Sequence, residues 1–395
     1  STSLSTSSSS SNSNIPLVLV TGVSGYIGTW VAYASLKLGY RVRGTVRSLS
    51  NESKVSHLRN LCPGSNYNIE LVEADLNSEK GWNEAVDGAT FILHVASPFP
   101  LAAPRNKEEL IRPAVDGTLY VLKAAAAANP RPKRVVVTSS FAAIGYGQVS
   151  DPSHPFNESN WTVIDDPERP IDAYTESKTL AERAAWEFHK SLPENERFEL
   201  CTINPTLVQG PMLSPNSCSS ADIPRQILMN ELPALADLDL FITHIYDVTK
   251  AHLLAMTHPG APNNRFLLCS GTLSFPQYAT ILKNEFSQYG YNCTCFVAPK
   301  PIIWLTSFWD KQAANILPSL GKKYYIDGKN VKDILGINVV NDVTSIIRDM
   351  SLAAIANGLI PDRSRDGVLT SSYVRPELDL TGVPTAEEIA QQLQG

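Results

Sequence analysis

Tyr174 and Lys178 are four residues apart in the segment Tyr174-Thr175-Glu176-Ser177-Lys178. On a helix this spacing places both side chains on one face. A free tyrosine has a pKa near 10 and is a poor acid–base catalyst at neutral pH, but a nearby positive charge lowers that pKa. The pair therefore predicts a tyrosine that delivers a proton to a carbonyl oxygen, with the lysine lowering the tyrosine pKa.

A group of hydroxyl residues precedes this pair in the chain. Thr138, Ser139 and Ser140 end an apolar run that we interpret as a strand. Ligands bind at the carboxyl edge of a parallel sheet, so these hydroxyls are expected beside the tyrosine. The order of hydroxyl, tyrosine and lysine favours a catalytic site over a chance surface pair.

A glycine motif near the start of the chain predicts a dinucleotide site. Gly22, Gly25 and Gly28 have the spacing Gly-x-x-Gly-x-x-Gly, directly after an apolar run and before a helical pattern. The first glycine permits a tight turn, the second lets the backbone approach a pyrophosphate, and the third lets helix and strand pack. The free N–H groups at the helix start then face the phosphates.

The second predicted strand indicates which dinucleotide is bound. An NAD site has an acidic residue at the end of this strand, where it holds the ribose hydroxyls. Here Arg47 stands at the end, and Lys54 follows one turn into the next helix. Both cations suit the 2′-phosphate of NADP. Asp75 is a candidate for the adenine amine, with capping of the following helix as its alternative role.

The elements that position these residues alternate between strand and helix. The sequence predicts strands and helices with an order typical of a doubly wound parallel Rossmann sheet of the α/β class. The strands are expected at 17–21, 41–46, 69–73, 90–95, 134–139 and 198–204, and the helices at 26–38, 107–128 and 172–190.

The pattern loosens after residue 204 and suggests further divisions. We expect a disordered Ser-rich tail at 1–14 and an NADP-binding domain at 15–204 with a returning segment at about 241–270. A smaller substrate-binding lobe is expected at 205–240 and 271–362. Residues 363–395 are expected to form a C-terminal extension with a short helix at 385–393.

Composition excludes several classes of function. The chain has 395 residues and a net charge of −6, so the basic footprint of a nucleic-acid partner is absent. It contains no apolar stretch long enough to span a membrane and no metal-ligand spacing among its histidines and cysteines. Scattered cysteines and the lack of a secretory signal predict a cytoplasmic protein with reduced thiols. We expect a monomer or homodimer that acts on a small-molecule carbonyl substrate.

Several motifs together carry a resemblance to a known family over roughly residues 15–360. The chain resembles the extended short-chain dehydrogenase/reductases, and in particular the branch with dihydroflavonol reductases, yeast aldehyde and methylglyoxal reductases, and cinnamoyl-CoA reductases. The motifs are Thr21 to Gly28, Thr45-Val46-Arg47, Ala74-Asp75-Leu76, His94 to Pro98, Val137 to Ser140, Tyr174 to Lys178, Ala184-Ala185-Trp186, Asn204 to Val208, Tyr246-Asp247-Val248 and Ala251-His252.

The resemblance implies catalytic and cofactor-binding roles. Ser140 would hydrogen-bond the substrate carbonyl, Tyr174 would protonate it, and Lys178 would hold the ribose hydroxyls of NADPH. The implied cofactor-binding residues are Gly22, Ser24, Gly25, Tyr26, Ile27, Gly28, Arg47, Lys54, Asp75, Leu76, Val95, Ala96, Ser97, Pro205, Leu207 and Val208.

The substrate pocket departs from the family's plant members. Gly145 stands where dihydroflavonol reductases carry an asparagine, and Asn160-Trp161 does not continue into the cinnamoyl-CoA reductase signature. The resemblance to yeast aldehyde reductases is stronger. Candidate pocket walls, each with core packing as the alternative, are Phe99, Phe141, Tyr146 and Met212, together with Phe308 and Trp309. Apolar walls of this kind suit aryl or alkyl aldehydes and ketones.

Three functions are compatible with these residues. An NADPH-dependent carbonyl reductase uses the whole Ser–Tyr–Lys set. Another enzyme of the same fold, such as a nucleotide-sugar epimerase or a hydroxysteroid dehydrogenase, would use it as well. A non-catalytic NADP-sensing module is the third, and retention of Tyr174 and Lys178 argues against it.

Overall fold

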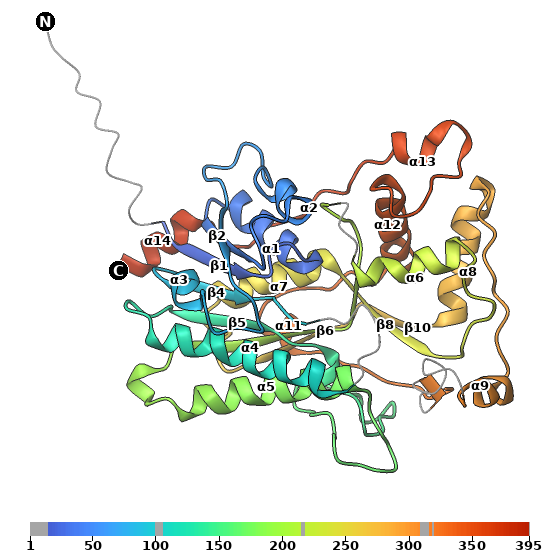
Figure 1. Ribbon diagram of the computed structural model, residues 1–395, viewed down its shortest axis with the longest axis horizontal. Helices are drawn as coiled ribbons and strands as arrows, with labels where there is room; N and C mark the ends of the chain where they lie inside the picture. The colour runs from blue at the N-terminus through green and yellow to red at the C-terminus, as the bar shows by residue number, and fades with distance from the viewer. Residues whose placement is uncertain (1–14, 99–105, 215–217, 309–315, 318–319, 395) are drawn as a thin grey trace, which may run out of the picture.

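The computed structural model describes residues 15–98, 106–214, 218–308, 316–317 and 320–394. Its centre is a parallel sheet of seven strands in the order β3-β2-β1-β4-β5-β6-β9 (Figure 1). The predicted doubly wound α/β fold is therefore confirmed. The strands are β1 Leu17–Thr21, β2 Arg41–Val46, β3 Glu70–Glu73, β4 Phe91–His94, β5 Arg134–Thr138, β6 Glu199–Pro205 and β9 Arg265–Leu268.

Alternating side chains of the central strands fill a core on each face of the sheet. In β1, Val18 and Val20 pack into one core and Leu19 into the other, as the two-residue period of a strand requires. All five β1 residues are buried, which explains why this run is continuously apolar.

Two layers of helices cover the sheet. One face carries α1 (Tyr26–Lys37) and α7 (Ile245–Thr257), and the other carries α3 (Trp82–Val86), α4 (Glu108–Ala127) and α5 (Ala173–Ser191). Asp172 caps α5 by accepting a hydrogen bond from the Thr175 backbone N–H at 2.8 Å. This cap fixes where α5 begins and therefore where Tyr174 lies on it.

A second sheet of three strands extends the molecule beyond β6. It has the order β10-β8-β7, with β7 Leu207–Gln209 parallel to β8 Asp239–His244 and β10 Gly271–Ser274 antiparallel to β8. Residues 241–270 thus begin in this sheet, continue through α7, and end in β9 of the large sheet. The surrounding elements are α6 Ser219–Leu228, α8 Phe275–Phe286, α9 Lys300–Thr306, α11 Asn330–Asp333 and α12 Val343–Ala356. Helices α6, α8 and α12 share a core with this sheet.

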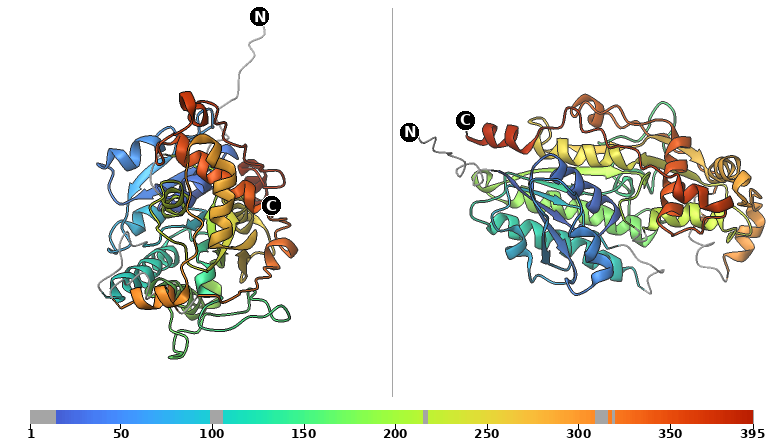
Figure 2. Two further views of the ribbon diagram at one scale, coloured as in Figure 1. Left: turned by 90° about the vertical axis from the view of Figure 1, so that its right-hand side faces the viewer. Right: turned by 90° about the horizontal axis from the view of Figure 1, so that it is seen from above.

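The C-terminal segment returns along the molecule to the large sheet. It passes α13 (Val368–Ser371) and ends in α14 (Ala386–Gln394), which lies at the opposite end of the molecule from α8 (Figure 2). The guanidinium of Arg375 stacks on Trp30 of α1 at 5.5 Å. The Ala386 N–H then donates to the Leu38 carbonyl at 3.0 Å. Residues 375–394 therefore pack as an outer layer over α1, whereas Leu369 of α13 packs in the core of the second sheet.

Truncating Ile389 should measure the contribution of this layer. Its side chain is 3% exposed and packs in the same core as α1 and α7. We expect Ile389→Ala to lower the free energy of unfolding by about 2 to 4 kcal/mol in urea titrations, because it leaves a cavity. The exposed Gln392 of the same helix is the control, and Gln392→Ala should stay within about 0.5 kcal/mol of wild type. Equal stability of both variants would contradict packing of α14 on the core.

Within the described residues, no helix is long and apolar enough to cross a membrane.

Candidate active site

The glycine turn after β1 leaves no room for side chains at two positions. Gly22 has φ +64°, and a Cβ there would lie 2.9 Å from Cα of Ala96. A Cβ on Gly28 would lie 2.4 Å from the Gly22 carbonyl oxygen. The first close approach comes from the loop after β4 and the second from the turn itself. Both glycines are therefore required by contacts that the backbone makes.

The start of α1 faces the carboxyl edge of the sheet with its N–H groups uncapped by a side chain. Gly25 is the N-cap residue, and no side-chain hydrogen bond closes this end. Such an end attracts phosphate through its N–H groups and the helix dipole. Its surroundings include the predicted residues Ser24, Tyr26 and Ile27, all partly buried. The residues present thus fit the pyrophosphate of a dinucleotide.

The end of β2 presents one arginine that is available to a ligand. Arg43 is engaged by Glu70 at 2.9 Å and by backbone carbonyls after α3, including that of Asp87 at 2.6 Å. Arg47 is exposed at the carboxyl end of the strand, and Lys54 lies partly buried in the short helix α2 (Glu52–Val55). This arrangement suits a phosphate beside Arg47.

Asp75 and Leu76 follow β3, and both make contacts within the protein. Asp75 accepts hydrogen bonds from the backbone and the side-chain amide of Asn77, each at 2.9 Å. These bonds close a local turn; the capping role that the sequence left open for Asp75 is not observed, because α3 begins at Trp82 after Gly81 with no side-chain cap. Leu76 packs on Gly117 of α4, where a Cβ would lie 2.7 Å from it.

The end of β4 is fixed by a buried histidine. His94 Nδ1 hydrogen-bonds the Thr21 hydroxyl at 2.9 Å, and the same hydroxyl accepts from the Ala96 N–H at 2.9 Å. Burial, together with the charge of Lys178, lowers the His94 pKa to about 3. His94 is therefore neutral at physiological pH and positions the segment that begins at Val95.

Ser140, Tyr174 and Lys178 meet at the carboxyl edge of β5. Ser140 is the second residue after β5, and its hydroxyl is hydrogen-bonded to the Tyr174 side chain. The Lys178 ammonium lies 5.9 Å from the centre of the Tyr174 ring. Lys178 is 8% exposed. The geometry therefore brings together a hydroxyl, a phenol and a cation from two elements.

The tyrosine pKa differs from what the sequence suggested. Lys178 was expected to lower it, but burial dominates and raises the Tyr174 pKa, while the hydrogen bond with Ser140 acts in the opposite direction. Burial also lowers the Lys178 pKa to about 8, against a smaller opposing effect of Glu182. Desolvation disfavours the charged form of both groups. Tyr174 thus keeps its proton at neutral pH, which suits a proton donor.

An aromatic cluster lies beside this set. Phe141 packs against Tyr146 at 5.6 Å and Phe241 at 5.2 Å between ring centres, and Tyr324 contacts Phe241 at 5.4 Å. Phe241 and Tyr324 were missed from the sequence, because nothing in their local pattern separates them from ordinary core residues. A Cβ on Gly145 would lie 2.1 Å from Phe141 Cζ, so this position admits no side chain unless Phe141 moves.

The remaining predicted pocket walls lie elsewhere. Met212 is 3% exposed in the core beneath the second sheet, so its side chain packs as a core residue. Phe308 is 68% exposed just after α9. Phe99 and Trp309 fall outside the described residues. Phe141 is likewise 3% exposed and packs as a core residue, so Tyr146, which is partly buried, is the one of the four principal candidates that remains beside the Ser–Tyr–Lys set among the described residues.

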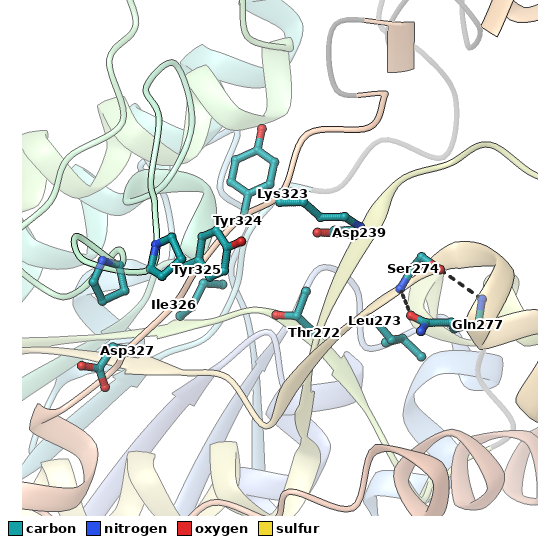
Figure 3. Close-up of a pocket in the computed structure, with 12 residues that line it drawn as sticks. Asp239, Thr272, Leu273, Ser274, Gln277, Lys323, Tyr324, Tyr325, Ile326 and Asp327 are labelled. Atoms are coloured by element: carbon teal, nitrogen blue, oxygen red, sulfur yellow. Dashed lines mark hydrogen bonds and ion pairs between the residues drawn. The ribbon is translucent and has the colours of Figure 1, made fainter.

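A cavity of about 590 Å³ opens on the outer side of the aromatic cluster. Figure 3 shows its lining from three elements: Tyr324 and neighbouring residues of the segment 323–327, Thr272 and Leu273 of β10, and Asp239 of β8. Lys323 bonds the largely buried Asp239 carboxylate at 2.6 Å and closes one wall. Tyr324 therefore belongs both to the cavity wall and to the cluster around Phe141.

The remaining predicted cofactor residues border the same edge. Pro205 and Val208 are buried and Leu207 is partly buried, at the junction of β6 and β7. Among the described residues, no group of three or more histidine, cysteine, aspartate or glutamate side chains could hold a metal ion.

The fold and the site together define a class of protein. A parallel doubly wound sheet, a glycine turn after its first strand, and a Ser–Tyr–Lys set at its carboxyl edge are the architecture of a dinucleotide-dependent oxidoreductase. Residues 18–269 match the NAD dependent epimerase/dehydratase family. The chain belongs to this family of extended short-chain dehydrogenase/reductases, as its motifs predicted.

Similar proteins include reductases of known name. The chain is 36% identical over 270 residues to tetraketide alpha-pyrone reductase 1 of Arabidopsis thaliana, covering 68% of this chain and 81% of that protein. It is 32% identical over 281 residues to an anthocyanidin reductase ((2S)-flavan-3-ol-forming) of Vitis vinifera, covering 68% and 81%. The crystal structure of Gre2 with NADPH from Candida albicans has a TM-score of 0.68 and 27% identity, covering 87% of this chain and 99% of that one. The protein is an NAD(P)-dependent oxidoreductase of this family.

Proposed function

We propose that the protein is an NADPH-dependent carbonyl reductase that converts an aldehyde or ketone to an alcohol. The observation that carries this proposal is the contact of Ser140 with Tyr174 beside the Lys178 ammonium, at the edge where α1 begins. NADPH, when bound, supplies a hydride and therefore the two electrons that reduce the carbonyl carbon.

The residues of the chain supply the proton and the orientation. Ser140 hydrogen-bonds the carbonyl oxygen and orients it toward Tyr174. The Tyr174 hydroxyl transfers its proton to that oxygen as negative charge develops there. The cation of Lys178 stabilises the resulting phenolate, which regains a proton from solvent. Burial of Tyr174 supports this role, because the raised pKa keeps the donor protonated before the reaction.

The preference for NADPH over NADH is supported by charge at the end of β2. Arg47 is exposed there, and Lys54 lies in the adjoining α2, whereas Arg43 is held by Glu70. A 2′-phosphate is recognised by arginine through charge-assisted hydrogen bonds. The related Gre2 structure contains NADPH, which agrees with this preference.

The substrate is proposed to be an aryl or alkyl carbonyl compound of low polarity. The partly buried Tyr146 and Tyr324 are the members of the aromatic cluster that a substrate could contact, and the buried Phe141 and Phe241 pack behind them. The relatives are named as reductases of anthocyanidins and tetraketide pyrones. Gly145 has no side chain to bind flavonoid hydroxyls, and Phe141 fills the space that the asparagine of dihydroflavonol reductases would need. This difference favours a simpler aldehyde or ketone as the substrate.

A cofactor assay tests this function. Purified protein is mixed with NADPH or NADH, and nicotinamide absorbance is followed across a panel of aryl and alkyl aldehydes and ketones. We expect carbonyl-dependent oxidation of NADPH with a higher kcat/KM than for NADH. Tight NADPH binding without turnover on any carbonyl would refute the reductase and favour a sensing module, and preference for NADH would refute the role of Arg47.

The proposal includes a reducing, cytoplasmic environment. All six cysteines are free thiols, and burial raises the pKa of Cys201 to about 12 and of Cys269 to about 11. Thiols of this kind are unreactive and need no oxidising compartment. A monomeric or homodimeric state stays a prediction.

A further inference from the structure

Glu182 lies one helical turn beyond Lys178 on the same face of α5 as Tyr174. It is 1% exposed, and it lines a cavity of about 20 Å³ together with Lys178, His94 and Ser139. Four-residue spacing from Tyr174 to Lys178 to Glu182 keeps all three side chains in one row. The carboxylate therefore faces the same small polar space as the ammonium.

The Glu182 carboxylate is held by hydrogen bonds from several elements. Ser139 donates to it at 2.5 Å and Asn204 at 2.7 Å, while Trp186 and Thr202 donate at 3.2 Å. Arg265 of β9 pairs with it at 2.6 Å. These hydrogen bonds hold the carboxylate in one orientation.

Arg265 is itself fixed, so this ion pair is rigid. Its guanidinium stacks on Trp161 at 4.0 Å and donates to the carbonyls of Asn160 at 2.5 Å and Glu158 at 2.8 Å. It is 8% exposed. A buried ion pair whose other donors are also hydrogen-bonded keeps its geometry. Removing one partner lowers the stability of the fold, because the other charge is left buried and unpaired.

The groups around Lys178 leave Glu182 as its counter-charge. Tyr174 shares the helix and keeps its proton, and His94 of β4 is neutral because its pKa is lowered to about 3. Helix α4 contributes Ala114 and Thr118 to the shared cavity, and β5 and the residue after it contribute Val137 to Ser139, none of which titrates. Burial lowers the Lys178 pKa to about 8, and Glu182 raises it.

We propose that Glu182 is a positioning residue that keeps Lys178 cationic and aligned with Tyr174, through a rigid network anchored by Arg265, Ser139 and Asn204. This inference rests on the proposed reductase function for its link to catalysis. The effect of Glu182 on the charge of Lys178 does not depend on whether a carbonyl substrate is found.

The test compares the pH profiles of Glu182→Gln and Glu187→Gln. Glu187 is exposed on the same helix, so its variant controls for loss of one acidic charge on α5. The Lys178 ammonium is needed for turnover, so activity is lost as pH rises through its pKa. Without the carboxylate that pKa falls, and the alkaline limb of kcat/KM should move down by about one pH unit in Glu182→Gln, with about tenfold less activity on that limb. Glu187→Gln should keep the wild-type profile.

A second variant and a second readout separate this role from simple support of the fold. Glu182→Asp keeps the charge, so it should keep the wild-type alkaline limb even where its thermal stability falls. The ¹³Cε resonance of Lys178, assigned by its loss in Lys178→Arg, reports the lysine pKa directly in the wild-type chain, in Glu182→Gln and in Glu182→Asp.

These measurements distinguish failure of the proposed role of Glu182 from failure of the proposed reductase function. An unshifted alkaline limb in a folded Glu182→Gln, with uniform loss at every pH, would overturn the proposal, as would a Lys178 titration in Glu182→Gln that is unchanged from wild type. Should Glu182→Gln not fold, Glu182→Asp decides the proposal. The proposal is overturned if the Lys178 pKa in Glu182→Asp equals that of a free lysine, or if the alkaline limb of kcat/KM in Glu182→Asp departs from wild type. Absence of turnover in wild type would sink the proposed function alone, because the ¹³Cε titration still decides the role of Glu182.

Discussion

Replacing Tyr174 by phenylalanine is expected to lower kcat/KM for carbonyl reduction by about 10²- to 10⁴-fold, the usual contribution of a positioned proton donor. The substitution removes the hydroxyl that contacts Ser140 and leaves the ring in place beside Lys178. Hydride transfer would then leave an alkoxide without a nearby proton. Steady-state assays with NADPH and the best carbonyl of the panel measure this loss.

The control for Tyr174→Phe is a tyrosine away from the sheet edge. Tyr289 lies in the short turn after α8, and Tyr289→Phe should retain wild-type kcat/KM. The NADPH Kd of Tyr174→Phe should stay within about twofold of wild type, since the phenol does not bind the phosphates. Full activity of Tyr174→Phe would mean that another group donates the proton, and an unaltered biological function would revive the NADP-sensing module.

Replacing Arg47 by alanine is expected to raise the NADPH Kd by about 10- to 100-fold and to leave the NADH Kd unchanged. A hydrogen bond to a charged group contributes about 1.5–3 kcal/mol. The 2′-phosphate is the group by which the two cofactors differ, so a contact with it affects NADPH alone. Titration of both cofactors by nicotinamide fluorescence measures the two constants.

Arg41 provides a matched control on the same strand. It is exposed at the start of β2, at the opposite edge of the sheet from Arg47. Arg41→Ala should therefore bind both cofactors as wild type does. Equal weakening of NADPH and NADH binding in Arg47→Ala would show that Arg47 supports the β2 turn rather than a 2′-phosphate.

The local sequence predicted the structure correctly at positions where the backbone conformation permits only certain residue types. Gly22 and Gly28 were singled out by spacing, and in the structure a Cβ added at either position would lie within 3 Å of a backbone atom. The six strands predicted up to residue 204 are present, because buried parallel strands are read as short apolar runs. Tyr174 and Lys178 meet because helical spacing alone places them on one face.

The Tyr174 pKa was predicted with the wrong direction. The sequence reveals that a lysine stands four residues away, but it does not reveal how deeply the phenol is buried. Burial is the largest effect and raises the pKa. Desolvation depends on every element that packs around a group, so it follows from tertiary structure alone.

The C-terminal extension shows a similar limit. Its last helix was predicted at 385–393 and is observed as Ala386–Gln394, because helical periodicity is local. Its docking on the core with α1 could not be predicted, since the contacts of Ala386 and Ile389 join residues more than 300 positions apart. A periodic apolar face indicates that a helix is covered without indicating by what.

By itself, the sequence determined the α/β class, the glycine turn, the Tyr174–Lys178 pair and the family, because each depends on residue types at short, regular spacing. The tertiary structure decided which side chains surround that pair. Glu182 stands at the same four-residue spacing and was overlooked, since a buried glutamate on a helix looks like a solvated one until Arg265 meets it from β9. Charge partners that are distant in the chain become neighbours only when the sheet order is fixed, and their burial then sets the protonation of the site.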